Sequence, residues 1–190
     1  MEAFSDGVFA IAITLLILDV AVPDVGPGES LAHALRHEWP SYFGYVVSFL
    51  TIGIVWWNHH ELFEDIRAAD HVLMVLNLLL LLCIAFAPFP TALLAQYVRE
   101  RRHEVVAVAA YGGTYTAMAV VFNALWLYAA YRARLLADGA TPARVRSRTL
   151  RYAFGPVLYG ASIPLAFLSP WLSLTLFGAL ALLYLLPPPE

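Results

Sequence analysis

Residues 4–22 read FSDGVFAIAITLLILDVAV, an almost continuous apolar stretch that can cross a bilayer core as a helix. Because a helix turns by about 100° per residue, six side chains of this segment fall on one stripe: Phe4, Gly7, Ile11, Leu15, Leu18 and Val22. Thr14 lies at the edge of this stripe. Asp6 points the opposite way. A helix surrounded only by lipid has no need for this separation, so the pattern is typical of a pore-lining helix.

The composition indicates an integral membrane protein, because 61% of the chain is hydrophobic and only 13% is charged. A net charge of −3 does not favour nucleic acid, and the single Cys83 excludes a disulfide within one chain. We therefore predict an all-α membrane protein with one domain over residues 1–190. Its six expected transmembrane helices are residues 4–22, 41–58, 71–95, 105–131, 150–168 and 171–186.

Arginines predict the orientation, since cytoplasmic loops of membrane proteins are enriched in basic residues. The connection between the fourth and fifth spans holds the largest group: Arg132, Arg134, Arg144, Arg146, Arg148 and Arg151. This connection is expected in the cytoplasm, together with both termini and residues 59–70. Arg99, Arg101 and Arg102 do not follow this rule, because the expected topology puts them on the outer side of the membrane. Two acidic residues, Glu100 and Glu104, lie beside them.

Polar residues gather where the first and second spans reach the same membrane face. Asp6 is expected to accept hydrogen bonds from Asn58 or from a histidine ring, which would remove the cost of a lone carboxylate near the bilayer. The predicted structural network consists of Ser5, Asp6, Asn58, His59 and His60. Ion binding or proton sensing by the same residues is the alternative, because histidine titrates near neutrality. Asp19, at the other end of the first helix, would attract cations to a pore mouth or simply be solvated.

Other chemistries find little support in the residues. The acidic and histidine side chains of residues 59–65 read as a solvated helix end rather than a metal site. A hydrolytic triad of Ser5, Asp6 and His59 is not supported, because the sequence around Ser5 does not match the sharp turn that exposes an activated serine. Residues 111–115, YGGTY, differ from the TVGYG filter of familiar potassium channels, and their glycines indicate close helix packing. We expect no enzyme, no cofactor, no resident metal and no small-molecule substrate. A small secondary transporter remains an alternative, although repeated halves with broken helices are not evident.

Three segments carry a resemblance to a known family: FSDGVFAIAITLL at residues 4–16, WWNHHELF at 56–63, and NLLLLLCIAFAPFPTALL at 77–94. They resemble the FSD signature and the following spans of the transmembrane protein 175 family, the endolysosomal potassium channels and their prokaryotic relatives. The likeness covers about the first half of the chain. The family motif also has an arginine four residues before its phenylalanine, a position that would precede Met1. Either the sequence begins downstream of that position, or the Asp6 network lacks this cation.

The resemblance implies a homotetramer of six-span subunits in a prokaryotic plasma membrane, with four first helices around a central pore. The implied hydrophobic constriction is Ile11, Leu15 and Leu18, and the implied selectivity residue is Thr14. Potassium would be the permeant ion, with modest selectivity. A proton-permeable channel is the alternative function within the same family.

Overall fold

The computed structural model describes residues 1–132, 135–136 and 141–185, and these residues are mainly helical. The elements are α1 (Glu2–Leu15), η1 (Leu16–Asp19), α2 (Leu31–His37), α3 (Trp39–Glu64), α4 (His71–Phe86), α5 (Pro88–Tyr97), α6 (Glu104–Leu127), η2 (Tyr128–Arg132), α7 (Pro142–Leu168) and α8 (Pro170–Leu185). η1 is a short 3₁₀-helix, and η2 is a turn of π-helix. An isolated antiparallel bridge joins Ile66 to Leu136.

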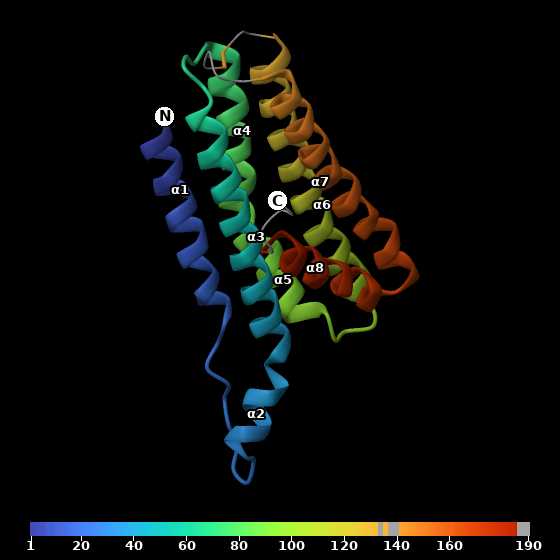
Figure 1. The fold of residues 1–190 in the computed structure, drawn as a ribbon. Helices are drawn as coiled ribbons and strands as arrows, with labels where there is room; N and C mark the ends of the chain where they lie inside the picture. Colours follow the sequence, from blue (N-terminus) through green and yellow to red (C-terminus); the bar gives the residue numbers. More distant parts are fainter. Residues whose placement is uncertain (133–134, 137–140, 186–190) are drawn as a thin grey trace.

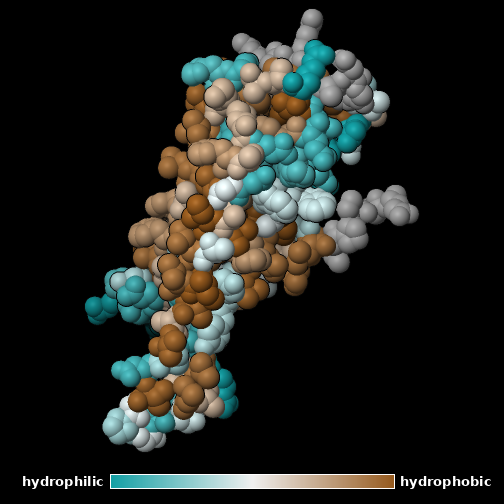
Figure 2. Space-filling view, turned by 90° about the vertical axis from the view of Figure 1, so that its left-hand side faces the viewer, coloured by the Kyte–Doolittle hydropathy of each residue, from teal (hydrophilic) through white to brown (hydrophobic). Residues whose placement is uncertain are grey.

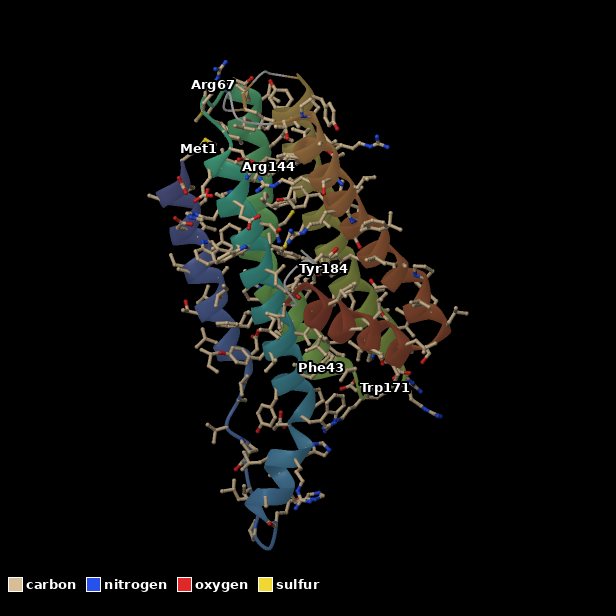
Figure 3. All side chains as sticks on the ribbon, in the orientation of Figure 1. Met1, Phe43, Arg67, Arg144, Trp171 and Tyr184 are labelled. Carbon is tan, nitrogen blue, oxygen red and sulfur yellow. The ribbon has the colours of Figure 1, made fainter. Side chains whose placement is uncertain are left out.

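Helices α1, α3, α4, α6 and α7 run lengthwise along the bundle, α8 is steeply inclined to them, and the short α2 projects beyond the bundle (Figure 1). On the side of the molecule that carries α1, hydrophobic surface dominates the middle and hydrophilic residues gather toward the ends (Figure 2). Met1 and Arg67 lie toward one end of the bundle, and Trp171 lies toward the other (Figure 3). An apolar middle between polar ends is the surface that a membrane-embedded subunit needs.

Within the described part of the chain, three helical segments are long and apolar enough by themselves to cross a membrane: Trp39–Glu64, His71–Tyr97 and Glu104–Tyr131. The apolar α8 is shorter. The first expected span corresponds to α1 with η1, and the fifth corresponds to α7. The first turns of α7 carry arginines. Arg134 and residue 186, the last of the sixth expected span, lie outside the described residues.

The first helix is shorter than the apolar run that predicted it. The α-helix ends at Leu15, η1 continues to Asp19, and Val22 lies in an extended connection. Proline disfavours helical geometry in the residue before it, and Pro23 follows Val22 directly. Val22 therefore does not belong to the helical stripe on which the sequence pattern put it.

The third expected span, residues 71–95, is divided into α4 and α5 at Ala87. Pro88 begins α5, because a proline is tolerated in the first turn of a helix but interrupts a helix interior. Asp70 caps α4 by accepting a hydrogen bond from the Leu73 backbone N–H at 2.9 Å. This bond, with a second one from the Tyr128 hydroxyl, holds the pKa of Asp70 below its usual value. The cap thus joins the start of α4 to the end of α6.

Aromatic side chains and a close helix approach hold α6, α7 and α8 together. Tyr111, Tyr115, Tyr159 and Phe177 form a buried cluster, with ring centroids 4.7 Å apart for Tyr111 and Tyr115. A Cβ atom at Gly112 would lie 2.5 Å from the Ser162 hydroxyl oxygen, so α6 and α7 can approach this closely only with glycine there. Gly113 has open space around its Cα. One of the two glycines of the YGGTY segment therefore serves helix packing.

A cluster of charges connects the ends of α3 and α7. Arg148 hydrogen-bonds the Asp65 carboxylate and lies 3.6 Å from Glu61 Oε2, while Arg144 lies 3.5 Å from the second oxygen of Asp65. Arg148 also donates to the Glu61 carbonyl oxygen at 3.3 Å. Because Arg148 and Asp65 are largely shielded from solvent, this contact is stronger than an ordinary surface ion pair.

We predict that Arg148→Gln lowers the free energy of unfolding by about 2 kcal/mol, the range for losing charge-assisted hydrogen bonds. Arg146 is exposed, and no ion pair of it is found among the described residues, so Arg146→Gln is the matched control with little expected effect. Thermal unfolding of both variants in detergent measures the difference. Equal losses of stability for the two variants would contradict the assignment.

Candidate permeation helix and its polar anchor

The first helix has two opposite faces in the folded subunit. Ser5, Phe9, Ala12 and the following Leu16 recur every three or four residues and are buried against α3 and α4. On the other side, the side chains of Ile11, Leu15 and Leu18 are 61%, 43% and 74% exposed. The aliphatic stripe is therefore not used for packing inside the subunit. It is available to lipid, to water or to another copy of the chain.

Thr14 lies on the exposed side near this stripe. Its hydroxyl oxygen is 2.9 Å from the carbonyl oxygens of Ala10 and Ile11, so the hydroxyl donates its hydrogen to its own helix. A hydroxyl has one hydrogen and two acceptor lone pairs. The oxygen of Thr14 consequently keeps acceptor capacity for a group outside the subunit, and a cation is one such group.

A buried hydrogen-bond chain anchors α1 to α3 and α4. The Asn77 amide donates to Ser5 Oγ at 3.0 Å, and its carbonyl oxygen lies 2.8 Å from His59 Nε2. An amide oxygen only accepts, so His59 Nε2 carries the hydrogen in this arrangement. All three side chains are almost completely buried, and the His59 ring also contacts Phe9, with centroids 5.3 Å apart. Asn77 therefore bridges two of the residues that the sequence pattern selected.

Asp6 has a different partner from the one expected. The indole Nε1 of Trp56 donates to Asp6 Oδ1 at 2.8 Å, in place of the expected amide or imidazole. Consecutive residues of a helix point about 100° apart, so Asn58, His59 and His60 cannot all face Asp6. Asn58 donates to the Ile54 carbonyl and accepts from Arg151 at 3.4 Å, and His60 lies 3.0 Å from Glu2. The five residues of the predicted network thus belong to four separate sets of contacts: Ser5 and His59 share Asn77, whereas Asp6, Asn58 and His60 each have partners of their own.

Asp19 ends η1, at the far end of the candidate permeation helix formed by α1 and η1, and is partly exposed. It lines a cavity of about 550 Å³ with Glu38, Arg99 and Glu100, among other residues. Arg99 donates to the backbone carbonyl of His37 and lies over the Trp39 ring, 5.8 Å from its centroid. Asp19 is therefore beside a solvent-accessible hollow of mixed charge.

Sequence reasoning missed Asn77 and Trp56 as partners. A signal for Asn77 was present, because it is the one amide within a run of leucines and other apolar residues from 72 to 86. A polar side chain in such a run must find a partner inside the protein. Trp56 carried no comparable signal, since tryptophans near span ends usually serve as interface anchors.

Comparisons with known proteins identify the family of this chain. A family model described as the endosomal/lysosomal potassium channel TMEM175 matches residues 1–88. A potassium channel of Streptomyces collinus is 50% identical over 185 residues, which cover 97% of this chain and 89% of that protein. The chain belongs to the TMEM175 family of cation channels. The match to the Streptomyces relative extends beyond residues 1–88 and also includes α6, α7 and α8.

A crystal structure from Chamaesiphon minutus, described as a lysosomal potassium-selective channel TMEM175 homolog, has the same fold. The TM-score is 0.86 at 41% sequence identity, over 96% of this chain and 93% of that one. An endosomal/lysosomal proton channel TMEM175 of Gallus gallus is 40% identical over 116 residues, covering 57% of this chain and 23% of the relative. Some relatives of this chain are therefore named potassium channels, and others are named proton channels.

We predict that Asn77→Leu destabilises the subunit by about 1–3 kcal/mol, because it leaves the buried His59 and Ser5 groups without their partner. Thr116→Val is the control, since the Thr116 hydroxyl donates only to the Gly112 carbonyl of its own helix. The measurement is the unfolding midpoint of each purified variant in one detergent. A loss no larger than that of Thr116→Val would show that the bridge contributes little.

Proposed function

We propose that four copies of this chain form a potassium channel in a bacterial plasma membrane, with α1 and η1 of each subunit around a central pore. The observation that carries this proposal is the exposed stripe of Ile11, Leu15 and Leu18, which lies opposite the anchored face of the same helix. A tetramer would bring four such stripes to one axis. The names of the Streptomyces and Chamaesiphon relatives support potassium as the permeant ion.

The arginine-rich connection supports an orientation with both termini in the cytoplasm. Met1, Arg67 and Arg144 lie toward the same end of the subunit (Figure 3). Since basic residues favour the cytoplasmic side, this end would face the cytoplasm and the α2 end would face outward. Asp19 would then lie near the outer mouth, where its charge raises the local concentration of cations.

The aliphatic stripe would act as a hydrophobic gate. A narrow ring of isoleucine and leucine side chains holds water poorly, and an ion inside it loses hydration without replacement. A small rotation or displacement of four first helices would widen the ring. The anchored face of α1, held by Ser5 and Phe9, limits this motion to one that keeps the subunit core intact.

Selectivity would come from Thr14, whose hydroxyl oxygen can replace part of the hydration shell of a cation. Potassium holds its water less tightly than sodium, so partial dehydration in a narrow pore favours potassium. One layer of hydroxyl groups gives weaker discrimination than several rings of backbone carbonyl oxygens. We therefore propose modest selectivity for potassium over sodium.

Proton permeation is the second candidate function. The name of the Gallus gallus relative favours it, and His60 with Glu2 supplies titratable groups at the start of the permeation helix. A proton current that persists in the absence of potassium and sodium would identify this activity.

We predict that Ile11→Asn increases potassium flux into proteoliposomes by about tenfold, because a polar ring lowers the dewetting barrier and about 1.4 kcal/mol corresponds to this factor. Ile17→Asn is the matched control: Ile17 is also exposed, but it lies off the stripe. Unchanged flux for Ile11→Asn, or an equal increase for Ile17→Asn, would reject the proposed constriction.

For Thr14→Ala we expect the potassium-to-sodium permeability ratio to fall by about threefold, since a lost contact of roughly 0.7 kcal/mol has this effect. Thr14→Ser keeps the hydroxyl and is expected to keep the ratio. Reversal potentials under bi-ionic conditions measure both variants. The hydroxyl has no role in selectivity if the alanine variant reverses at the same potential as the original channel.

A further inference from the structure

A cavity separate from the permeation helix lies among α3, α6, α7 and α8. Its volume is about 70 Å³, several times the roughly 10–15 Å³ that one water molecule requires. Apolar side chains such as Val55, Met118 and Phe122 form much of its wall, and no residue of α1 lines it. The cavity therefore has room for a narrow apolar group and takes no part in the proposed pore.

Arg151 lines this cavity together with Asn58 and two tyrosines, Tyr152 and Tyr184. Tyr184, from α8, lies about midway along the bundle (Figure 3), whereas Arg151 is at the start of the fifth expected span, residues 150–168. Tyrosine and arginine are amphipathic residues that commonly lie where hydrocarbon meets lipid headgroups. The cavity thus combines an apolar interior with the kind of polar residues found at that boundary.

The charge of Arg151 is not balanced in the way its neighbours' charges are. Arg144 and Arg148, two turns or less before it on α7, lie against the carboxylates of Asp65 and Glu61. Arg151 is half-buried, and its contact is the neutral amide oxygen of Asn58 at 3.4 Å. Among the residues that the structure describes, no carboxylate pairs with it. A partly desolvated guanidinium of this kind gains from an external anion.

We propose that this cavity is a binding site for an anionic phospholipid, with the lipid phosphate on Arg151 and part of one acyl chain among the apolar side chains. Basic pockets between transmembrane helices on the cytoplasmic side are favourable for anionic headgroups. A membrane lipid fits better than a soluble phosphate, because the wall of the cavity is largely apolar. The site is contained within one subunit, so it does not depend on the proposed pore.

Native mass spectrometry of the purified protein tests this proposal, with phosphatidylglycerol and phosphatidylcholine of identical acyl chains as probes. We expect phosphatidylglycerol to bind more tightly, and Arg151→Gln to weaken its binding by about tenfold, the factor for losing roughly 1.4 kcal/mol of charge-assisted contact. Arg151→Lys should retain most of the preference. Arg146→Gln removes an exposed arginine of the same helix and should leave the affinity unchanged.

Ala119→Leu provides a second variant that keeps Arg151. It fills part of the cavity from α6 and should weaken phosphatidylglycerol binding, even if Arg151→Gln fails to fold. Soluble glycerol 3-phosphate is the third probe, and we expect it to bind far more weakly than the lipid. Equal binding of the two lipids, equal losses for Arg146→Gln and Arg151→Gln, no effect of Ala119→Leu, or tight binding of glycerol 3-phosphate would each overturn the proposal.

Discussion

The hydrogen-bond chain from His59 through Asn77 to Ser5 is the constraint on which the arrangement of α1 depends. These groups are buried where no solvent can replace a lost partner, so each broken bond costs about 1–3 kcal/mol. A rotation of α1 by one residue would turn Ser5 away by about 100° and separate it from Asn77. The chain thus fixes which face of α1 packs against α3 and α4, and the aliphatic stripe faces outward as a consequence.

This division of one helix into two faces would let the helix that is anchored to the subunit core also supply the proposed gate. The inner face, with Ser5, Phe9 and Ala12, holds the helix against the core. The outer face is free to meet its symmetry copies in the proposed tetramer. Thr14 adds a polar oxygen near that face, and its hydrogen is already donated to the helix backbone. Anchoring, gating and selectivity would therefore use different sides and levels of the same element.

Helical periodicity predicted the two faces of α1 because a period of 3.6 residues relates neighbours within one helix. It could not predict Asn77 as the bridge, since that contact joins residues 72 positions apart and depends on how α4 packs. The expected bond from Asn58 or a histidine to Asp6 differed from the observed one because side chains next to each other in sequence diverge around α3. Hydropathy marked the apolar cores of the spans and missed their ends. The first helix ends at Asp19, before Pro23, and Pro88 divides the third apolar run, whereas α7 begins at Pro142 within a polar, arginine-rich stretch.

Cysteine cross-linking between subunits tests most directly whether the outer face of α1 surrounds a shared axis. In a Cys83→Ser background, Leu18→Cys would bring new thiols to the proposed axis, while Leu182→Cys would place them on α8, where Leu182 is 65% exposed. The account predicts that mild oxidation in membranes links Leu18→Cys subunits into covalent dimers and leaves Leu182→Cys subunits as monomers. The account would be contradicted if Leu18→Cys subunits stayed monomeric after oxidation while their thiols reacted with a lipid-soluble reagent. That result would show that the stripe faces the bilayer.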